Sequence, residues 1–281
     1  MRRPGRASAL RAAAAMPFPP DAAARLRSET FVRTVEVYAE LGSTNDRALE
    51  LAADADLALP ALILAERQTD GRGRGAHRWT APAGGLTFTL LFEPPAGLAD
   101  VALLAPVTGL AVADAATALP GDPGGQIGVK WPNDVLLRPA PPMSDARAPW
   151  GKLAGVLCER PRANRVAVGV GLNLNCDPAA FPSHLERPAA SLRRDGAPHD
   201  PIAVLIDLLV RLETEFAALA DGGRLDPIRW AARDALAGRT VRVAVGGAVV
   251  EGSACGVTPD GALRVFDGHT VREVRSGTVA W

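Results

Sequence analysis

The sequence predicts an α/β (α+β) protein, in which a mixed sheet with flanking helices precedes a small all-β module. Between about residues 33 and 237, stretches with the two-residue period of strands alternate with stretches of helical period. After Gly238 the chain consists of short Val-rich runs separated by Gly and Asp turns, which is typical of small β structures. The 281 residues, of which 48% are hydrophobic, suffice for the cores of one large and one small domain.

The chain begins with a segment that has the composition of a disordered leader. Residues 1–20 contain four Arg, several Ala and Pro, and no acidic residue. The same composition is found in organelle transit peptides, and Met16 offers an alternative start. We therefore predict a disordered leader over residues 1–28, a large domain over 29–237 and a small β domain over 238–281.

The individual elements follow from hydrophobic periodicity and from turn residues. The predicted strands of the large domain lie at 34–41, 61–66, 85–92, 127–131, 134–138, 152–159 and 165–174. Its predicted helices lie at 43–53, 100–118, 201–220 and 227–237. A polar Gly/Arg loop separates two strands at 68–78, and a Pro-rich stretch at 139–149 is predicted to be an exposed hairpin loop. The small domain has predicted strands at 240–245, 248–256, 262–266 and 270–275.

Charge and composition exclude several classes of protein. Thirty-one basic residues balance thirty-one acidic ones, so the chain lacks the overall positive charge that sequence-independent nucleic-acid binding requires. The charge-free stretches are shorter than the ~18 to 20 apolar residues of a membrane helix. Three cysteines, Cys158, Cys176 and Cys255, lie far apart and share no short spacing with histidines, which favours neither disulfides nor zinc. We predict a cytoplasmic protein that binds neither nucleic acid nor membranes.

Lys and Asn are rare in this chain, and their positions select the motifs to consider. Only two of the 31 basic residues are Lys, at positions 130 and 152. An ammonium group is a compact point charge, which suits contact with a phosphate or carboxylate oxygen. Asn133 follows Lys130 by three residues, and three further Asn lie in short strings with Gly, Ser or Thr.

The loop at 68–79, with the sequence QTDGRGRGAHRW, alternates Gly with Arg72 and Arg74 directly after a predicted strand. Such a loop can bring backbone N–H groups and two guanidinium groups to an anion. It lacks the Lys-Ser/Thr pair of a P-loop and the spacing of a dinucleotide fingerprint. A solvated flexible loop is the alternative interpretation, and a Gly-rich loop that orders over a ligand would also exclude water from a reactive intermediate.

Three further strings place polar residues at the ends or on one face of strands. KWPND at 130–134 ends a strand with a Lys and a rigid X-Pro turn, and KLAGVLCE at 152–159 begins with the other Lys and has Gly155 in its interior. In RVAVGVGLNLN at 165–175, alternate Val and Leu form an apolar face, and two Gly and two Asn lie on the other. The glycines leave room for a flat ligand, and Asn173 can donate and accept hydrogen bonds.

A fifth string, Ser-Thr-Asn at 43–45, is typical of a helix N-cap. The free N–H groups and hydroxyls at the start of a helix also bind small polar ligands.

These five strings, taken in their order along the chain, resemble the motifs of the biotin protein ligases, or biotin–[carboxyl-carrier protein] ligases. The resemblance covers residues 33–281 and rests on GRGR at 71–74 followed by Trp79, KWPND, KLAG at 152–155, and GVGLN at 169–173. It implies a biotin/lipoate ligase-like catalytic domain and a small C-terminal SH3-like β-barrel, in the monofunctional form without a DNA-binding domain.

The activity implied by the resemblance has two steps. Biotin and ATP, with Mg²⁺, give biotinyl-5'-adenylate, and the biotin then passes to a lysine of a biotin carboxyl carrier domain of a biotin-dependent carboxylase. The enzyme would act as a monomer or a homodimer. The residues agree with this chemistry, because attack of a carboxylate on the α-phosphate joins two anions and requires cations placed there beforehand.

The resemblance also implies residue roles. Lys152, bridging the carboxylate and the α-phosphate, and Arg74, covering the intermediate, are the expected catalytic residues. The expected biotin-binding residues are Ser43, Thr44, Asn45, Gln68, Arg72, Gly73, Arg74, Lys152 and Gly155. The expected ATP-binding residues are Gly71, Arg72, Arg74, Lys130, Asn133, Asp134 and Asn173. No metal site of the protein itself is expected, since Mg²⁺ would arrive with ATP.

Three other functions are weighed against this one. A lipoate-protein ligase shares the implied fold and adenylation chemistry, and Gln68 and the GRGR spacing favour biotin over lipoate. An RNA-binding module that uses the Gly/Arg loop is disfavoured by the neutral charge balance and by an aromatic content of 5%. An inactive biotin-binding homologue is disfavoured by the retention of both Lys.

Overall fold

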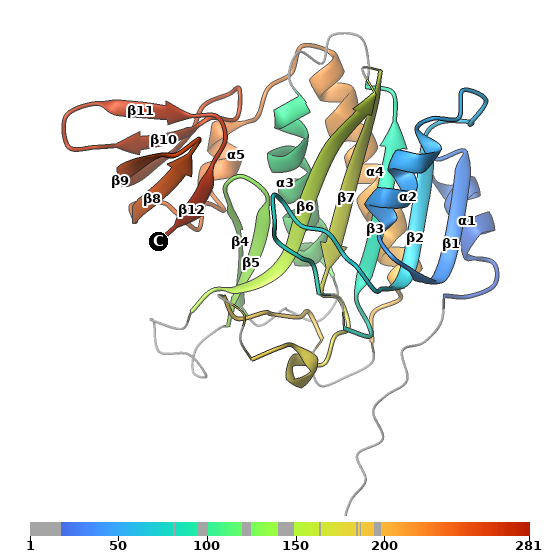
Figure 1. Ribbon diagram of the computed structural model, residues 1–281. Coiled ribbons are helices and arrows are strands. Elements are labelled where there is room, and N and C mark those ends of the chain that lie inside the picture. Colours follow the sequence, from blue (N-terminus) through green and yellow to red (C-terminus); the bar gives the residue numbers. More distant parts are fainter. Residues whose placement is uncertain are drawn as a thin grey trace, which may run out of the picture.

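The structure is a computed structural model that describes residues 18–80, 82–94, 101–119, 125–139, 149–162, 164–183, 185, 187–193 and 198–281. A seven-stranded mixed sheet with helices forms the larger part, and a five-stranded antiparallel sheet formed by the C-terminal strands lies beside it (Figure 1). This arrangement confirms the predicted fold class of a mixed-sheet domain followed by a small β module.

The large sheet has the strand order β1-β2-β3-β7-β6-β5-β4. Only β1 and β2 pair in parallel, and every other neighbouring pair in this sheet is antiparallel. The strands are β1 Thr34–Leu41, β2 Ala61–Gln68, β3 Leu86–Phe92, β4 Gly125–Lys130, β5 Asp134–Pro139, β6 Gly151–Arg162 and β7 Arg165–Leu172. Each predicted strand of this domain is present, with bounds shifted by a few residues.

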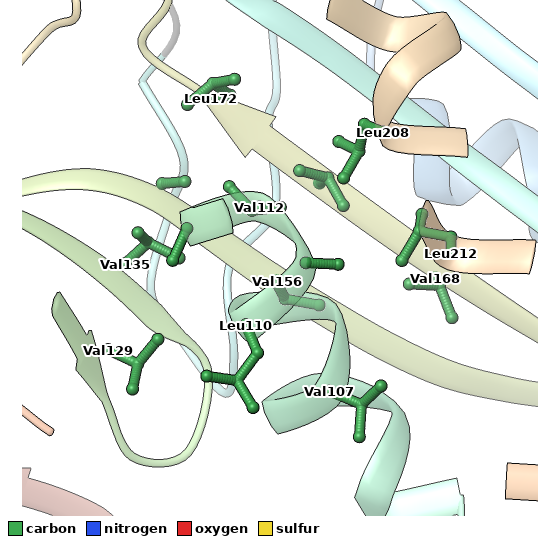
Figure 2. Packing of buried hydrophobic residues seen from close by; sticks show 14 of the residues in the cluster. Val107, Leu110, Val112, Val129, Val135, Val156, Val168, Leu172, Leu208 and Leu212 are labelled. Atoms are coloured by element: carbon green, nitrogen blue, oxygen red, sulfur yellow. The ribbon is translucent and has the colours of Figure 1, made fainter. Parts of the chain in front are cut away.

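The main core lies on one face of this sheet, against α3 (Leu104–Ala118) and α4 (Pro201–Ala220). Val168 and Leu172 of β7 point toward the two helices, as does Val156 of β6 (Figure 2). The alternation predicted for residues 165–175 is thereby confirmed, because its Val and Leu positions are in the core and the Gly positions face the opposite side.

One described helix, Val101–Ala118 including the 3₁₀ turn η1 (Val101–Leu103), is long and apolar enough by composition to cross a membrane. However, 67% of that window is buried inside the fold, where the helix contacts α4 and strands β4 to β6. It is therefore the core helix of the large domain.

The other face of the sheet carries α2 (Thr44–Leu51), which packs on β2, β3 and β7. Its Ala48 and Ala52 form a separate apolar cluster with Ile63, Leu91 and Ala167. The cluster is at the C-terminal half of α2, so the N-terminus of the helix is held directly over the glycine-bearing face of β7. Two short helices complete the fold, η2 (Pro178–Ala180) and α5 (Pro227–Ala231).

The five-stranded sheet has the order β11-β10-β9-β8-β12. Its strands are β8 Thr240–Val245, β9 Ala248–Val257, β10 Leu263–Phe266, β11 Val271–Val274 and β12 Thr278–Ala280. The indole Nε1 of buried Trp131 donates a hydrogen bond to the carbonyl of Gly261 (2.9 Å), which ties the turn after β4 to this module. β12 was not predicted, because three residues are too few to establish a period.

Two predictions about the elements are wrong in part. Within the predicted leader at 1–28, the structure forms α1 (Ala22–Glu29), because Ala22 and Leu26 lie on one helix face and are buried against the core. Residues 1–17 lie outside the described residues. The helix predicted over 227–237 ends at Ala231, because the backbone of residues 233–235 pairs with Val129 of β4 instead. Of the predicted hairpin loop at 139–149, residues 140–148 also lie outside the described part.

Candidate functional site

A cavity of about 1010 Å³ lies over the glycine-bearing face of the large sheet. It is bounded by the start of α2, the loop after β2, the turn between β4 and β5, and strands β6 and β7. Four residues that follow β7, Phe181, Leu185, Arg187 and Ala189, and the segment 277–281 complete its lining. All but one of the sequence-predicted site residues line it. The exception is Gly71, whose Cα packs against the carbonyl of Trp79, so that a Cβ there would collide with this backbone.

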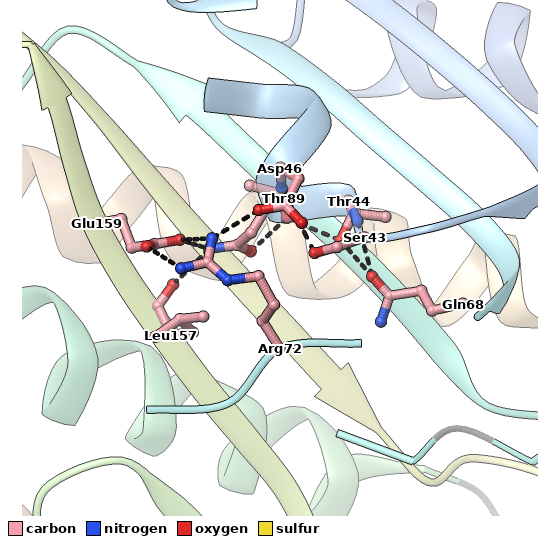
Figure 3. A network of polar contacts seen from close by, with 9 residues as sticks. Ser43, Thr44, Asp46, Gln68, Arg72, Thr89, Leu157 and Glu159 are labelled. Atoms are coloured by element: carbon pink, nitrogen blue, oxygen red, sulfur yellow. Dashed lines mark hydrogen bonds and ion pairs between the residues drawn. The ribbon is translucent and has the colours of Figure 1, made fainter. Parts of the chain in front are cut away.

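One end of the cavity is formed by the N-terminus of α2, where uncharged polar groups gather (Figure 3). Ser43 has the extended backbone of an N-cap, and its hydroxyl accepts a hydrogen bond from the backbone N–H of Asp46. The backbone N–H and the hydroxyl of Thr44 both donate to Gln68 Oε1, at 2.7 and 3.1 Å. These two hydrogen bonds hold the side-chain carbonyl oxygen of Gln68 at the start of the helix. They also fix the direction in which the amide nitrogen of Gln68 points.

Asn45 is buried between the helix and the sheet, with a relative exposure of 5%. Its Oδ1 accepts a hydrogen bond from Thr89 Oγ1 (2.7 Å), and its Nδ2 donates to Glu159 Oε2 (2.9 Å). A Cβ at Gly169 would collide with Asn45 Oδ1, so only glycine at this position allows the helix to approach the strand so closely. Asn45 therefore connects α2, β3 and β6 beneath the cavity.

Arg72, in the loop after β2, binds two carboxylates (Figure 3). Its guanidinium donates to both carboxylate oxygens of Glu159, at 3.0 and 2.7 Å, and to Asp46 Oδ1 at 2.7 Å. Such forked, charge-assisted contacts fix the plane of the guanidinium. Glu159 was not predicted as a site residue, and it is the group that joins Arg72 to Asn45.

Trp79 closes the loop over the sheet. Its indole lies against the Cα of Gly171, where a Cβ would collide with the ring, and a Cβ at Gly155 would lie 3.4 Å from it. The Nζ of Lys152 lies 5.7 Å from the centre of the same ring. The prediction that Gly169 and Gly171 leave room for a flat ligand is therefore wrong, because the side chain of Asn45 lies against Gly169 and the indole of Trp79 lies against Gly171.

The centre of the cavity holds two ammonium groups around one carboxylate. Lys152 Nζ lies 2.7 Å from Asp134 Oδ1, and Lys130 Nζ lies 3.5 Å from Asp134 Oδ2. Burial lowers the pKa of Lys130, and nearby Arg187 and Lys152 lower it further against the effect of Asp134. Burial alone would raise the pKa of Asp134, but the two ammonium groups outweigh it and lower that pKa.

Two Asn residues near this centre are held by the backbone. Asn133 Nδ2 donates to the carbonyl of Val156 (2.8 Å), and Asn173 Nδ2 donates to the carbonyl of Lys152 (3.2 Å). Asn173 is buried, and its Oδ1 has no hydrogen-bond partner among the described residues. A buried acceptor of this kind costs free energy unless a ligand or water supplies a donor.

Arg74 and Gly73 place the Gly/Arg loop beside the C-terminal module. Arg74 Nη1 donates to the carbonyl of Gly277 at 2.6 Å, just before β12. Gly73 N–H donates to the carbonyl of His77 (2.8 Å), which folds the loop back on itself. The loop therefore bridges the two sheets across the cavity. The contribution of segment 277–281 was not predicted, because the three residues of β12 are too few to show the period of a strand.

Together these features make a cavity with an uncharged, hydrogen-bonding end and a cationic centre. Comparison with known proteins shows the family of the chain. The sequence profile of the "Biotin/lipoate A/B protein ligase family" matches residues 38–177. A biotin–[acetyl-CoA-carboxylase] ligase of Paracoccus denitrificans is 35% identical over 246 residues, which are 85% of this chain and 96% of the relative. The chain belongs to the biotin protein ligase family.

Other members of the family are also similar over most of their length. The biotin–[acetyl-CoA-carboxylase] ligase of Mycobacterium tuberculosis is 32% identical over 254 residues, which are 88% of each chain. The solved structure of biotin protein ligase from Aquifex aeolicus in complex with biotin and ATP superimposes with a TM-score of 0.71 at 24% identity. The match covers 88% of this chain and 98% of that one, and it shows that the two share the family fold.

Proposed function

We propose that the chain activates biotin with ATP to biotinyl-5'-adenylate and then transfers the biotin to a lysine of a biotin carboxyl carrier domain. The main support for this proposal is that one cavity extends from the N-terminus of α2 to Lys152. Hydroxyl and amide groups line its α2 end, and ammonium groups line its centre. A substrate with a neutral polar ring and a carboxylate fits those two ends. The names of the two bacterial relatives support biotin as that substrate.

At the uncharged end, Ser43, Thr44 and Gln68 would bind the ureido ring. Because Gln68 Oε1 is bonded to Thr44, its amide nitrogen is the group left to donate to a ligand carbonyl. Asn45 would hold the helix start in place rather than contact the ring, since both of its polar atoms are bonded within the protein. Gly155 and Gly171 allow the indole of Trp79 to lie close to the strand backbone, and this ring would form one wall of the biotin site.

In the first step, a biotin carboxylate oxygen attacks the α-phosphorus, the bond to the β-phosphate oxygen breaks, and pyrophosphate leaves. Lys152 would lie between carboxylate and α-phosphate, and Lys130 beside the phosphates, so that negative charge develops next to preplaced cations. Arg72, Gly73 and Arg74 would cover the adenylate, and Asn173 Oδ1 would accept a hydrogen bond from the adenine amino group.

Mg²⁺ would enter with the phosphates of ATP, whose charge it neutralises. The described residues contain no group of three or more His, Cys, Asp or Glu that could hold a metal ion. Asp134 is the carboxylate of this region, and both of its oxygens contact Lys side chains. We propose that Asn133 and Asp134 lie on the side of the cavity where the phosphates and Mg²⁺ of ATP would bind.

In the second step, the amine of the acceptor lysine attacks the acyl carbon, AMP leaves with the bonding electrons, and the amine loses a proton. No covalent intermediate on the enzyme is needed, so orientation within the cavity supplies much of the rate. For the location, we propose the cytoplasm, a reducing compartment in which the three free cysteines are stable.

The direct test is to incubate the protein with MgATP and either biotin or lipoate, and to separate the acyl adenylates by chromatography. Biotinyl adenylate from the biotin reaction alone would support the proposal. Lipoyl adenylate would transfer the same mechanism to a lipoate-protein ligase, which the family profile also includes. The absence of both adenylates would refute the proposal.

A further inference from the structure

Arg187 is a half-buried cationic residue of the cavity that has no place in the steps described above. The other Lys and Arg residues that line the cavity each bond to an oxygen of the chain. Arg72 and Arg78 bind carboxylates, Arg74 binds a carbonyl, and Lys130 and Lys152 share Asp134. Among the described residues, Arg187 has neither a hydrogen bond nor an ion pair within the chain. None of its five N–H donors is bonded to another described residue, so these donors are available to a ligand.

Arg187 lines the same cavity as Lys130, Lys152 and Asp134, which form the cationic centre. Arg187 is close enough to Lys130 to lower the pKa of that ammonium, and Asp134 acts on Arg187 in the opposite direction. Burial is the main cause of the lowered pKa of Arg187 itself. Three cationic side chains, Lys152, Lys130 and Arg187, therefore line one cavity together with the carboxylate of Asp134.

The guanidinium of Arg187 is held by an aromatic ring. Its Cζ lies 4.7 Å from the ring centre of Trp281, and the Cζ of Arg239 lies 4.0 Å from that centre. Arg239 is itself fixed, because its Nε donates to the carbonyl of Ala235 at 2.9 Å. A cation over an indole is oriented without losing its hydrogen-bond donors, which remain available in the plane of the guanidinium.

On the basis of the proposed function, we infer that Arg187 binds the β- and γ-phosphates of ATP and the pyrophosphate that leaves, and that Trp281 is its positioning residue. Lys152 would contact the α-phosphate. The other cations of the cavity would then contact the β- and γ-phosphates. A polyphosphate is the one substrate of this reaction whose charge exceeds what Lys152 and Lys130 can balance. The planar fork of Arg suits two phosphate oxygens at once.

The test measures pyrophosphate binding directly, by calorimetric titration of the full chain with inorganic pyrophosphate and Mg²⁺. Arg187→Ala should weaken this binding about tenfold and raise the KM for ATP by a similar factor, with biotin affinity unchanged. Arg187→Lys should recover part of the loss. Arg264→Ala, an exposed arginine on β10, is the matched control and should behave as the parent protein.

Trp281 is tested by a pair of variants. Trp281→Leu should raise the KM for ATP with little change in kcat, and Trp281→Phe, which keeps an aromatic face, should restore most of the parent KM. If Trp281 only stabilised the fold, Trp281→Leu would lower kcat as well as raise the KM for ATP.

Two outcomes overturn the inference. One is a folded Arg187→Ala variant whose pyrophosphate affinity equals that of the parent, and the other is a defect confined to the KM for the carrier domain. Failure of the proposed function gives a different result, since the parent protein would then form no biotinyl adenylate. The pyrophosphate titration needs no biotin, so it reports on Arg187 in either case.

Discussion

Replacing Lys152 should separate catalysis from folding. The Lys152 side chain is 34% exposed and contacts Asp134 at 2.7 Å, at the start of β6. Asp134 is 13% exposed, but it keeps Lys130 as a second ammonium partner, so loss of this ion pair costs about 1 to 3 kcal/mol and Lys152→Ala should remain folded. Lys152→Met, which retains the aliphatic stem beside Trp79, provides a second variant with still less disturbance of packing.

The catalytic loss is expected to be much larger. Removing one group that stabilises developing charge in an active site lowers kcat by roughly 10² to 10³, or about 3 to 4 kcal/mol. A unit charge about 4 Å from the phosphoryl oxygens, at an effective dielectric constant of about 20, gives a similar figure of about 4 kcal/mol. Because both figures are this large, we expect the rate of adenylate formation to fall almost to zero in the two Lys152 variants.

The assay is biotin-dependent exchange of pyrophosphate into ATP, measured together with the melting temperature. Arg160→Ala, an exposed residue on the same strand, is the control and should retain the parent rate. If either Lys152 variant melts like the parent and exchanges pyrophosphate within about tenfold of the parent rate, Lys152 is not the charge-stabilising group.

Three further perturbations test other parts of the site. Gly171→Ala should displace the indole of Trp79 and weaken biotin binding by about tenfold or more, measured by calorimetry, because the new Cβ has no space. Arg74→Gly should retain adenylation but release the adenylate, seen as biotin labelling of bystander proteins, since the loop loses its bond to the C-terminal module. Asp134→Asn should make stability less sensitive to acid. The pKa of Asp134 is below its ordinary value of 3.8, so the stability that its ionised form contributes is fully present above that pH and declines as the pH falls toward the lowered pKa. Urea unfolding at about pH 5 and about pH 3 would measure this loss.

Each of these predictions has a control or a contradicting result. Gly109→Ala, at a helical glycine with open space around it, should leave biotin binding unchanged, and equal effects at both glycines would refute the steric argument. Bystander labelling by Arg74→Gly at the parent level would show that the loop contact does not retain the adenylate. An Asp134→Asn variant that loses as much stability as the parent between the two pH values would remove Asp134 from the acid response.

Much of the site was predictable because its residues lie in local patterns. The Ser-Thr-Asn cap at 43–45 and the Gly-bearing face of β7 each follow from rules that act over a few residues. Lys130 and Lys152 were recognisable because they are the only two lysines of the chain. The structure brings these separate strings to one cavity, as the resemblance to the biotin protein ligases implies.

The parts that were missed depend on contacts between distant segments. Arg187 is one arginine among many, and only its place beside Trp281 and the cavity distinguishes it. Glu159 became part of the site through its fork with Arg72, 87 residues away in the chain. The predicted helix to residue 237 was cut short by pairing with β4, and α1 formed where composition indicated disorder, because tertiary burial outweighs local propensity.

The most direct test of the account is intact-mass analysis of a biotin carboxyl carrier domain after incubation with this protein, MgATP and either biotin or lipoate. We expect the carrier domain to gain one biotinyl group in the biotin reaction and no group in the lipoate reaction. It should also gain no group when the Lys152→Ala variant replaces the parent. A lipoyl adduct, or an unmodified carrier in the presence of biotin and a carrier that a known ligase can modify, would contradict it.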